Sequence, residues 1–407
     1  MLCLKIPSTA MYDVLVIGGG VIGLRIAIRW KELFPKQKIC LIEKESAFGM
    51  HASRRNSGVI HAGFYYSPDS LKAKLTREGS RRLRTYCAER NIPLLSCGKL
   101  VVAQRATELS ALRELFERGQ TNGVELYELD EKEVSTLDPN VRTVGKAVYS
   151  PTTASVDPSL VVEAYVCEAE ERGVILQSST QYLGKRGSTI LTTQGEIKAG
   201  YVVNAAGLYA DKIARDFGCA RELAILPFKG LYLVSKDPNP ALRMHVYPVP
   251  HANYPFLGVH FTRTVDGKLK IGPTAIPAFW RENYTLRENF KWGEFGEIMA
   301  NELGLLVHNR FHFAKLAWEE MQKFSKRRLL KRAASLVHVL HPEQYHTWGQ
   351  PGIRAQLIDK KKRTLVMDFC VERTADSLHI LNAVSPAFTC AISFAEYVLQ
   401  EVRERDS

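Results

Sequence analysis

The sequence predicts an α/β protein in which a parallel-sheet domain is interrupted by a second, mostly antiparallel domain. Three observations support this fold class. An apolar strand, a helix and a second apolar strand follow one another between residues 12 and 43. A strongly apolar strand at 201–206 ends in small residues, which indicates a return to the same sheet. Between residues 228 and 272, short strands alternate with turns as in antiparallel sheets, and 407 residues suffice for two hydrophobic cores.

The first strand–helix–strand segment carries a glycine pattern at its first turn. Residues 13–17 form a branched apolar run, and Gly18, Gly20 and Gly23 then fill the three positions of G-x-G-x-x-G. In a dinucleotide site the first glycine permits the tight turn, and the second lets the backbone approach a pyrophosphate. The third allows the helix to pack closely on the strand. Because strand, helix and second strand are all present, this pattern predicts a dinucleotide site.

The end of the second strand supports the same prediction. The apolar run 39–42 ends on Glu43, twenty residues after Gly23. A carboxylate at this place can accept hydrogen bonds from both ribose hydroxyls of an adenosine and would repel a 2′-phosphate. The helix N-terminus offers N–H groups and a partial positive charge to the phosphates. Lys44 opens the loop that follows and is a further candidate contact.

Periodicity and turn residues predict the remaining elements. Helices are expected at 68–90, 106–118, 154–172, through most of 286–340, and at 385–402. Strands are expected at 98–104, 124–129, 174–176, 188–193, 196–198, 230–234, 245–249, 257–263, 268–272, 367–371 and 378–384. Asp266-Gly267 is a suitable hairpin turn between the strands on either side of it.

The composition is that of an ordinary globular chain. No apolar run reaches 18 residues, so we expect no spanning helix, and residues 1–10 form an N-terminal extension without the features of a signal peptide. Eight cysteines lie far apart without a C-x-x-C pair, which favours a reducing compartment and gives no metal site. We therefore expect a cytoplasmic protein.

Beyond the glycine turn, a series of short motifs closely resembles the L-2-hydroxyglutarate oxidase/dehydrogenase family. These FAD enzymes are related to D-amino-acid oxidase and glycerol-3-phosphate dehydrogenase. The motifs are Asn56–Gly63, Tyr65–Tyr66, Ser70–Ala73, Cys97–Leu100, Asn204–Gly207, Pro227–Gly230, Tyr247–Pro250, Phe256–His260, Ile353–Gln356 and Ser385–Ala387. The chain departs from the family pattern at Arg54 and Arg55, where members carry glycine and histidine, and at Phe388, where they carry alanine.

The resemblance implies FAD as the cofactor and a discontinuous Rossmann-like FAD-binding domain at 11–80, 145–215 and 345–407. An antiparallel-sheet substrate domain with helices would occupy 81–144 and 216–344. The expected cofactor contacts are Gly18, Gly20, Gly23, Glu43, Lys44, Arg55, Asn56, Ser57, Gly58, Ala206, Gly207, Ser385, Pro386 and Ala387. The last helix would direct positive charge at the flavin N1–C2 edge, unless Ser385-Pro386 is merely a cap and first-turn proline.

The resemblance also implies oxidation of a 2-hydroxy acid, which needs a base for the hydroxyl proton and a cation for the carboxylate. His61 and His260 lie in family motifs and are the two candidate bases, although either could be a structural histidine. Arg354 is the expected carboxylate clamp, with a salt bridge as the alternative. Lys229 is a candidate for a second carboxylate, and Tyr247 either contacts the substrate or packs.

The predicted function is FAD-dependent oxidation of L-2-hydroxyglutarate, or a close 2-hydroxy diacid, with electrons passed to a quinone or oxygen. The alternative is the same chemistry on a 2-amino acid or glycerol 3-phosphate, and the Arg54–Arg55 pair keeps a phosphorylated substrate open. Binding to nucleic acid is disfavoured, because the chain lacks the interleaved aromatic and basic residues that stack bases.

The net charge of +12 is partly concentrated between residues 323 and 332. The cations there are Lys323, Lys326, Arg327, Arg328, Lys331 and Arg332, and the predicted helix 314–340 also carries Leu316, Phe324, Leu329, Leu330, Leu336 and Val337. Such a mixture can lie in a membrane interface, so we expect peripheral contact with an anionic membrane on its inner face. The alternative is that the leucines pack on the core while the cations face water.

Overall fold

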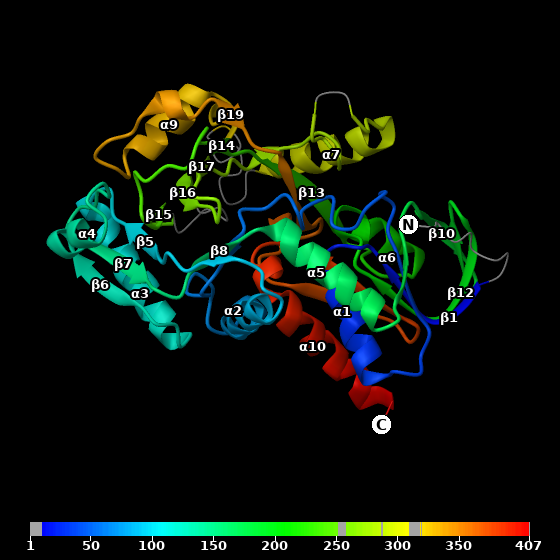
Figure 1. The fold of residues 1–407 in the computed structure, drawn as a ribbon. Helices are drawn as coiled ribbons and strands as arrows, with labels where there is room; N and C mark the ends of the chain where they lie inside the picture. Colours follow the sequence, from blue (N-terminus) through cyan, green and yellow to red (C-terminus); the bar gives the residue numbers. More distant parts are fainter. Residues whose placement is uncertain (1–9, 251–257, 286–287, 309–317, 319, 407) are drawn as a thin grey trace. The chain divides into compact units, whose positions relative to one another are not determined.

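The computed structural model describes residues 10–250, 258–285, 288–308, 318 and 320–406. The chain divides into two compact units, each built from separate segments (Figure 1). The first unit comprises Met1–Asn56, Pro158–Leu226 and Ala355–Ser407. The second unit comprises Ser57–Asp157 and Pro227–Arg354. The N-terminal extension at 1–9 and the predicted Leu316 lie outside the described residues.

The bounds of these units differ from the predicted domain bounds. Residues 57–80 and 145–157 belong to the second unit, because β3 (Val59–Ile60) pairs with β8 (Ala154–Val156), which also pairs with β4 (Leu94–Leu95). Residues 216–226 belong to the first unit and 345–354 to the second. At these two places, β13 (Leu223–Gly230) and β20 (Gly352–Asp359) continue from one unit into the other, so no break in the sequence marks the bound.

A parallel sheet forms the centre of the first unit and confirms the predicted α/β fold class. Its parallel strands are, in order, β9 (Ile175–Gln177), β2 (Ile39–Ile42), β1 (Ala10–Ile17), β12 (Gly195–Asn204) and β23 (Ser377–Asn382). Antiparallel strands β10 (Tyr182–Arg186), β11 (Thr189–Thr192) and β22 (Cys370–Arg373) extend it. Every residue of β2 is buried, which explains its continuous apolar sequence.

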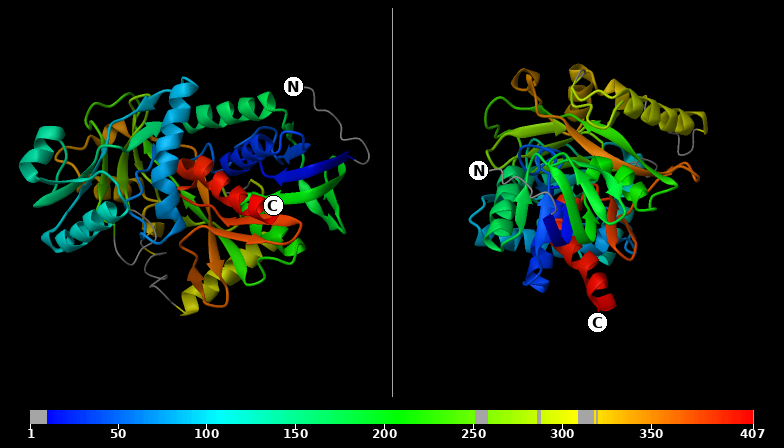
Figure 2. Two further views of the ribbon diagram at one scale, coloured as in Figure 1. Left: turned by 90° about the horizontal axis from the view of Figure 1, so that it is seen from below. Right: turned by 90° about the vertical axis from the view of Figure 1, so that its right-hand side faces the viewer.

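Helices cover the sheet of the first unit. α1 (Val21–Leu33) packs against α5 (Pro158–Glu171) and α10 (Ala387–Asp406), and Figures 1 and 2 show α10 beside α1. Arg25 of α1 is buried and pairs with Glu168 of α5 at 2.9 Å. A short helix, α6 (Ala210–Asp216), follows the turn Gly207–Tyr209.

The second unit is organised around a mostly antiparallel sheet. Its strands are, in order, β19 (Thr347–Trp348), β14 (Leu233–Val234), β17 (Leu269–Gly272), β16 (His260–Arg263), β15 (His245–Pro248), β5 (Lys99–Val102), β7 (Lys146–Ser150) and β6 (Tyr127–Asp130). β5 and β15 pair in parallel, whereas the other neighbours are antiparallel. β18 (Ile276–Pro277) pairs with β13 in this unit, whereas β21 (Thr364–Leu365) pairs with the part of β20 that lies in the first unit.

The helices of the second unit include α2 (Leu71–Glu89), α3 (Leu109–Thr121), α4 (Glu131–Leu137), α7 (Trp292–His308) and α9 (Lys326–Ala334). α2 begins later than predicted, because Ser70 rather than Ser67 accepts the capping hydrogen bond, from Ala73 N–H at 3.1 Å. The segment 154–172 is likewise not one helix, since β8 precedes α5.

The two faces of the central sheet of the second unit differ in chemistry. Leu100, Val246 and Phe261 are partners in register and belong to one buried apolar cluster with Leu329 and Leu330 of α9. In β5 and β15, the neighbouring residues Lys99, His245 and Tyr247 point to the opposite face, because side chains alternate along a strand. We call Lys99, His245, Tyr247, His260 and Thr262 the polar face.

Four of the apolar residues that the sequence offered for membrane contact are buried within the protein. Leu329, Leu330, Leu336 and Val337 are buried in the apolar cluster, and Lys323 is buried beside Glu320. These four apolar side chains therefore stabilise the core of the second unit, so the alternative account is correct for them. Within the described residues, no helix combines the length and the apolar character needed to cross a bilayer.

Candidate active site

The predicted cofactor residues of the first unit gather at one edge of its sheet. Parallel strands end on the same side, and Gly18 follows β1, Glu43 follows β2, Ala206 follows β12 and Ser385 follows β23. In open α/β sheets this carboxyl edge is where ligands bind. The structure therefore brings together the nucleotide residues that the sequence predicted separately.

Two glycines of the turn occupy positions that have no room for a side chain. Gly18 has φ +109°, and a Cβ there would lie 2.5 Å from the carbonyl oxygen of Ala205. A Cβ on Gly23 would lie 2.0 Å from the carbonyl oxygen of Gly18. Both contacts are with backbone atoms, which cannot rotate away. The turn thus depends on glycine at both positions, as the sequence pattern predicts.

The N-terminus of α1 completes the turn. Gly20 is the N-cap residue, and the Ser53 hydroxyl accepts a hydrogen bond from Val21 N–H at 3.0 Å. A Cβ on Gly20 would approach Ser53 Oγ to 2.9 Å, so a side chain there would crowd the cap. The first turn of α1 carries no acidic residue, which leaves its positive end suited to an anionic pyrophosphate.

Glu43 is buried and fastens the turn through both carboxylate oxygens. Oε2 accepts from Gly19 N–H at 2.8 Å, and Oε1 accepts from Glu45 N–H at 2.9 Å. Each carboxylate oxygen can accept a second hydrogen bond, which leaves capacity for the ribose hydroxyls. Lys44 pairs with Glu45 and lies over the ring of Tyr209, with Nζ 5.7 Å from the ring centroid.

The loop after Glu43 holds its own backbone together. Arg55 Nε donates to the Met50 carbonyl at 2.8 Å, and the Asn56 amide donates to the Ser53 carbonyl at 2.8 Å. In the first unit Arg54 forms an ion pair with Glu163 at 2.8 Å, so one of the two adjacent arginines already has a carboxylate partner within the protein. This contact weakens the case for a phosphorylated substrate at Arg54.

The other predicted cofactor residues lie at turns. Gly58 has φ +76°, and its carbonyl accepts from Val156 N–H at 2.9 Å, while the Ser57 hydroxyl accepts from Val59 N–H at 3.3 Å. Ala206 N–H donates to Asn204 Oδ1 at 3.2 Å, and Gly207 has φ +53°. Ser385, Pro386 and Ala387 lead directly into α10. The side-chain-free turn, the positive helix end and the buried acid fit the adenosine half of FAD.

The polar face of the second unit contains His260, one of the two candidate bases. His260 is buried, and its ring stacks on Tyr247 with centroids 3.7 Å apart. Its Nδ1 lies 3.0 Å from the Gly258 carbonyl oxygen, which can only accept, so Nδ1 carries the hydrogen and Nε2 is left as an acceptor. Burial and then the charge of Lys99 hold the pKa of His260 well below its ordinary value.

His61, the other candidate base, lies in the loop after β3 and is also buried. Burial and then the charge of Lys99 lower the pKa of His61 well below its ordinary value, with smaller effects from His260, His245 and Arg354. Both histidines are therefore neutral at physiological pH and are able to accept a proton. The interactions also show that His61 lies within electrostatic range of both Lys99 and Arg354.

Arg354 stands near the end of the second unit, in β20, and remains partly accessible. Burial lowers the pKa of its guanidinium, and Tyr66 and Tyr232 act in the opposite direction. These two tyrosines place Arg354 beside the aromatic residues that border the polar face, because Tyr232 also raises the pKa of Tyr247. An arginine in this setting can bind a carboxylate by two parallel hydrogen bonds.

Lys229 and Tyr247 have different surroundings. Lys229 is buried in β13, and burial lowers its pKa, but no charged group contributes to that shift in the described part of the chain. Tyr247 is buried between His260 and Lys99 Nζ, which lies 4.5 Å from its ring centroid. Tyr247 therefore belongs to the polar face, whereas no described residue of that face contributes to the pKa shift of Lys229.

Lys99 is the residue of this region that the sequence did not single out. Its side chain is fully buried, and burial lowers its pKa to about 7. A signal was present, because Lys99 stands in the Cys97–Leu100 motif at the start of an otherwise apolar strand. The burial of this face results from the pairing of β15 and β16 beside β5, which the sequence alone does not show.

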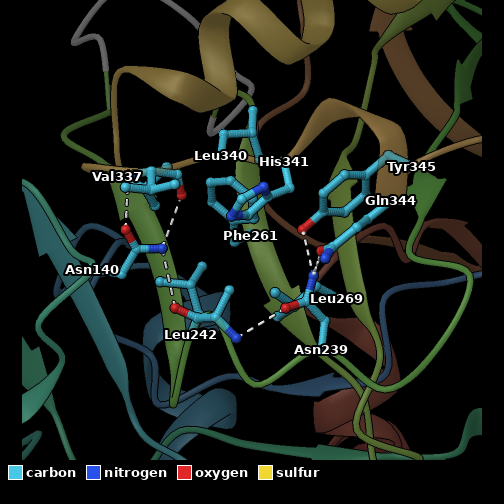
Figure 3. Close-up of a pocket in the computed structure, with 12 residues that line it drawn as sticks. Asn140, Asn239, Leu242, Phe261, Leu269, Val337, Leu340, His341, Gln344 and Tyr345 are labelled. Carbon is cyan, nitrogen blue, oxygen red and sulfur yellow. Dashed lines mark hydrogen bonds between the residues drawn. The ribbon is translucent and has the colours of Figure 1, made fainter.

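A small cavity lies on the opposite side of the same sheet (Figure 3). It is lined by Asn140, Asn239, Phe261, Tyr345 and neighbouring apolar side chains, and about 10 Å³ is open to the centre of a water molecule. That volume holds roughly one water. Phe261 points away from the polar face, so this cavity is separate from the candidate catalytic residues.

Comparison with known proteins defines the class of protein. The family described as FAD dependent oxidoreductase matches residues 13–400 of the chain. Solved structures with the same fold include L-alpha-glycerophosphate oxidase from Mycoplasma pneumoniae with FAD bound (TM-score 0.76, 23% identity, 96% of this chain and 94% of that chain). Glycine oxidase from Geobacillus kaustophilus has a TM-score of 0.73 at 21% identity, over 97% of this chain and 95% of that chain.

Similar relatives of known activity are L-2-hydroxyglutarate dehydrogenases. The mitochondrial enzyme of Nematostella vectensis is 35% identical over 99% of this chain and 92% of its own length. The Escherichia coli K12 enzyme is 33% identical over 97% of this chain and 93% of its own length. The human mitochondrial enzyme is 33% identical over 98% of this chain and 90% of its own length. The chain belongs to the L-2-hydroxyglutarate dehydrogenase family of FAD-dependent oxidoreductases, with FAD as its cofactor.

Proposed function

We propose that the protein oxidises L-2-hydroxyglutarate to 2-oxoglutarate. The observation that carries the proposal is the set of groups around His61: after burial, the positive charges of Lys99, His260, His245 and Arg354 all lower its pKa. No carboxylate contributes to the pKa shifts of these groups among the described residues. A buried site with two cations and neutral histidines suits a dianionic acid that must lose a proton.

Each residue of this site has a proposed role. Arg354 binds the carboxylate next to the hydroxyl and fixes the orientation of Cα. His260 Nε2 accepts the hydroxyl proton, because its tautomer is set by the Gly258 carbonyl, and His61 is the rival for that role. The Gly18–Gly23 turn, the α1 N-terminus and Glu43 hold FAD, which supplies the hydride acceptor when bound.

The test is anaerobic reduction of the flavin by a panel of substrates. L-2-hydroxyglutarate should bleach the bound flavin, whereas its D enantiomer, 2-amino acids and glycerol 3-phosphate should not. Bleaching by a 2-amino acid or by glycerol 3-phosphate, but not by L-2-hydroxyglutarate, would replace the proposed substrate. Protein that cannot be reconstituted with FAD would contradict the assignment of the glycine turn.

For the oxidative half-reaction, we propose a quinone or oxygen as acceptor and peripheral contact with an anionic membrane. The support is the surface around α9: Arg327 and Arg328 are exposed, and the side chains of Trp318 and Phe324 are 67% and 56% exposed. Near an anionic surface each cation contributes about 1 kcal/mol. The buried leucines of α9 take no part, so the contact rests on charge and on these two aromatic residues.

Vesicle co-sedimentation tests the membrane contact. Binding should require anionic lipid, decrease with salt, and weaken when Lys326, Arg327 and Arg328 become glutamate. Exposed lysines in the first unit, such as Lys36, provide a matched charge-reversal control. Equal pelleting with neutral and anionic vesicles, or none with either, would favour a soluble acceptor.

A further inference from the structure

Lys99 is placed at the centre of the polar face by strand pairing. In β5 it is the register partner of His245 in β15 and of Ser150 in β7. Two residues further along β15, Tyr247 projects from the same face, and β16 brings His260 against the Tyr247 ring. The position of the lysine is therefore fixed by backbone pairing on both sides and does not depend on a loop.

The ammonium group of Lys99 has aromatic neighbours but no acceptor. Nζ lies 4.5 Å from the ring centroid of Tyr247, 4.9 Å from that of Tyr65 and 5.1 Å from that of Phe64. The side chain has no exposed surface, and within the described residues Nζ has no hydrogen-bond partner. Cation–π contacts stabilise the charge but satisfy none of its three N–H donors.

Two other buried cations of the second unit have carboxylate partners, which Lys99 lacks among the described residues. Lys323 pairs with Glu320, and Arg281 pairs with Glu297 at 3.4 Å. A buried charge without such a partner is costly, so a fold keeps one where an external group supplies the acceptor. The strongest chemical match to an ammonium with three open donors is a carboxylate.

We propose that Lys99 binds the distal carboxylate of a 2-hydroxy dicarboxylic acid, while Arg354 binds the carboxylate next to the hydroxyl. This inference rests on the proposed function and adds the residue that selects diacids over monoacids. Both cations act on His61, which therefore lies within electrostatic range of each, as a substrate held at both ends requires. Lys229, the lysine that the sequence suggested for this role, lacks that connection.

The experiment compares two substrates that differ only at the far end: L-2-hydroxyglutarate and L-2-hydroxypentanoate. In Lys99→Met, the ratio of their kcat/KM values should fall roughly 30- to 1,000-fold, because a buried charged contact to the diacid is lost. Glutarate, which has both carboxylates but no hydroxyl, gives a second readout through its perturbation of the flavin absorbance. Its Kd should rise by a similar factor in Lys99→Met holoenzyme.

Two further variants serve as controls. Lys146→Met removes the same charge from β7 in the same sheet, at a side chain that is 48% exposed, and should leave the ratio unchanged. Lys229→Met tests the rival lysine. Equal losses on both substrates in Lys99→Met, or a change of ratio in Lys229→Met alone, would overturn the assignment of Lys99.

The pH dependence of the wild-type enzyme tests the same assignment without a substitution. The titratable groups that face Lys99 are Cys97, Tyr65 and Tyr247, whose pKa values are raised by burial, and His61, His245 and His260, whose pKa values are lowered by burial. With a pKa of about 7, Lys99 is cationic below neutrality and loses its charge above it. The KM for the diacid should therefore rise from pH 6 to pH 9, while that for the monoacid should not. Parallel changes would overturn the inference.

Failure of this inference is distinguishable from failure of the proposed function. If wild-type flavin is bleached by L-2-hydroxyglutarate but glutarate binds Lys99→Met as tightly as wild type, the function stands and the role of Lys99 is wrong. If another acid of the panel bleaches the flavin instead, the glutarate titration still measures whether Lys99 holds a carboxylate.

Discussion

The glycine turn of the first unit and the polar face of the second unit prepare a binding site in opposite ways. The turn offers backbone N–H groups and excludes side chains, since a Cβ on Gly18 or Gly23 would collide with a carbonyl oxygen. The polar face offers side chains that project from hydrogen-bonded strands, and strand pairing and ring stacking fix the positions of Lys99, Tyr247 and His260. One region recognises its ligand through close approach of the backbone, and the other through the chemistry of its side chains.

This difference separates substitutions that damage the fold from those that damage only chemistry. At Gly18 and Gly23 an added Cβ meets backbone atoms, so stability and cofactor binding are lost together. On the polar face, a residue of similar volume can replace a functional one without moving the strands. Four predictions test this contrast, from the largest expected effect to the smallest.

Gly23→Ala should have the largest effect. The added Cβ would lie 2.0 Å from the Gly18 carbonyl oxygen, so β1 and α1 must separate, at a cost of about 3–5 kcal/mol in the free energy of unfolding. The midpoint temperature of thermal unfolding and the flavin absorbance retained by the protein should both decrease. Gly296→Ala in α7, where a Cβ meets open space, is the control and should be neutral or slightly stabilising. A Gly23→Ala protein with wild-type flavin content would show that the turn is more tolerant than its geometry indicates.

His260→Asn should slow the chemistry while leaving the fold intact. Loss of the proton acceptor should reduce the rate of flavin reduction at saturating L-2-hydroxyglutarate by about 10²–10⁴-fold. Stopped-flow reduction measures this rate, and His61→Asn is the paired variant. If only His61→Asn slows reduction, the two histidines exchange their assigned roles.

Arg354→Ala should retain flavin and lose substrate affinity or orientation. Removal of a charge-assisted carboxylate contact should cost about 2–4 kcal/mol in kcat/KM, since burial lowers the pKa of the guanidinium and the group is only partly accessible to water. Arg186→Ala, at an exposed position of β10, provides the control. Unchanged reduction at low substrate concentration would place the carboxylate clamp elsewhere.

Lys99→Met should stabilise the protein, because it removes a buried charge. The pKa of Lys99 falls from 10.5 to about 7 on folding, so the unfolded chain binds more protons between these values and stability rises with pH in that window. The penalty is greatest below pH 7. After allowance for lost cation–π contacts, the variant should gain about 1–4 kcal/mol at pH 6 and less at pH 9. A gain that is the same at both pH values would show that the buried lysine is not titrating.

The sequence predicted the glycine turn well because its parts are local. Gly18, Gly23 and Glu43 fall within one strand–helix–strand segment, and each role follows from a fixed distance along the chain. The polar face was only partly predictable. His260 and Arg354 were found through motifs, but Lys99 was missed, because alternation shows which residues share a face and not what covers it.

The same limit applies to the apolar side chains of the basic segment. Leu329 and Leu330 lie on one side of α9, and the cations on the other, which fits a membrane surface as well as a protein core. Only the position of the sheet decides between the membrane surface and the protein core, since these leucines pack in one buried cluster with Leu100, Val246 and Phe261.

The pairing of strands far apart in sequence has a consequence for synthesis of the chain. β1 must wait for β12, β12 must wait for β23, and β5 must wait for β15, so both sheets close late. Until then, the edges of β1 and β5 present unpaired backbone groups that can join another chain. Slow, non-local folding of this kind favours aggregation of incomplete chains. Chains truncated before Ser377 should accordingly accumulate in the insoluble fraction, which sedimentation of the nascent products would measure.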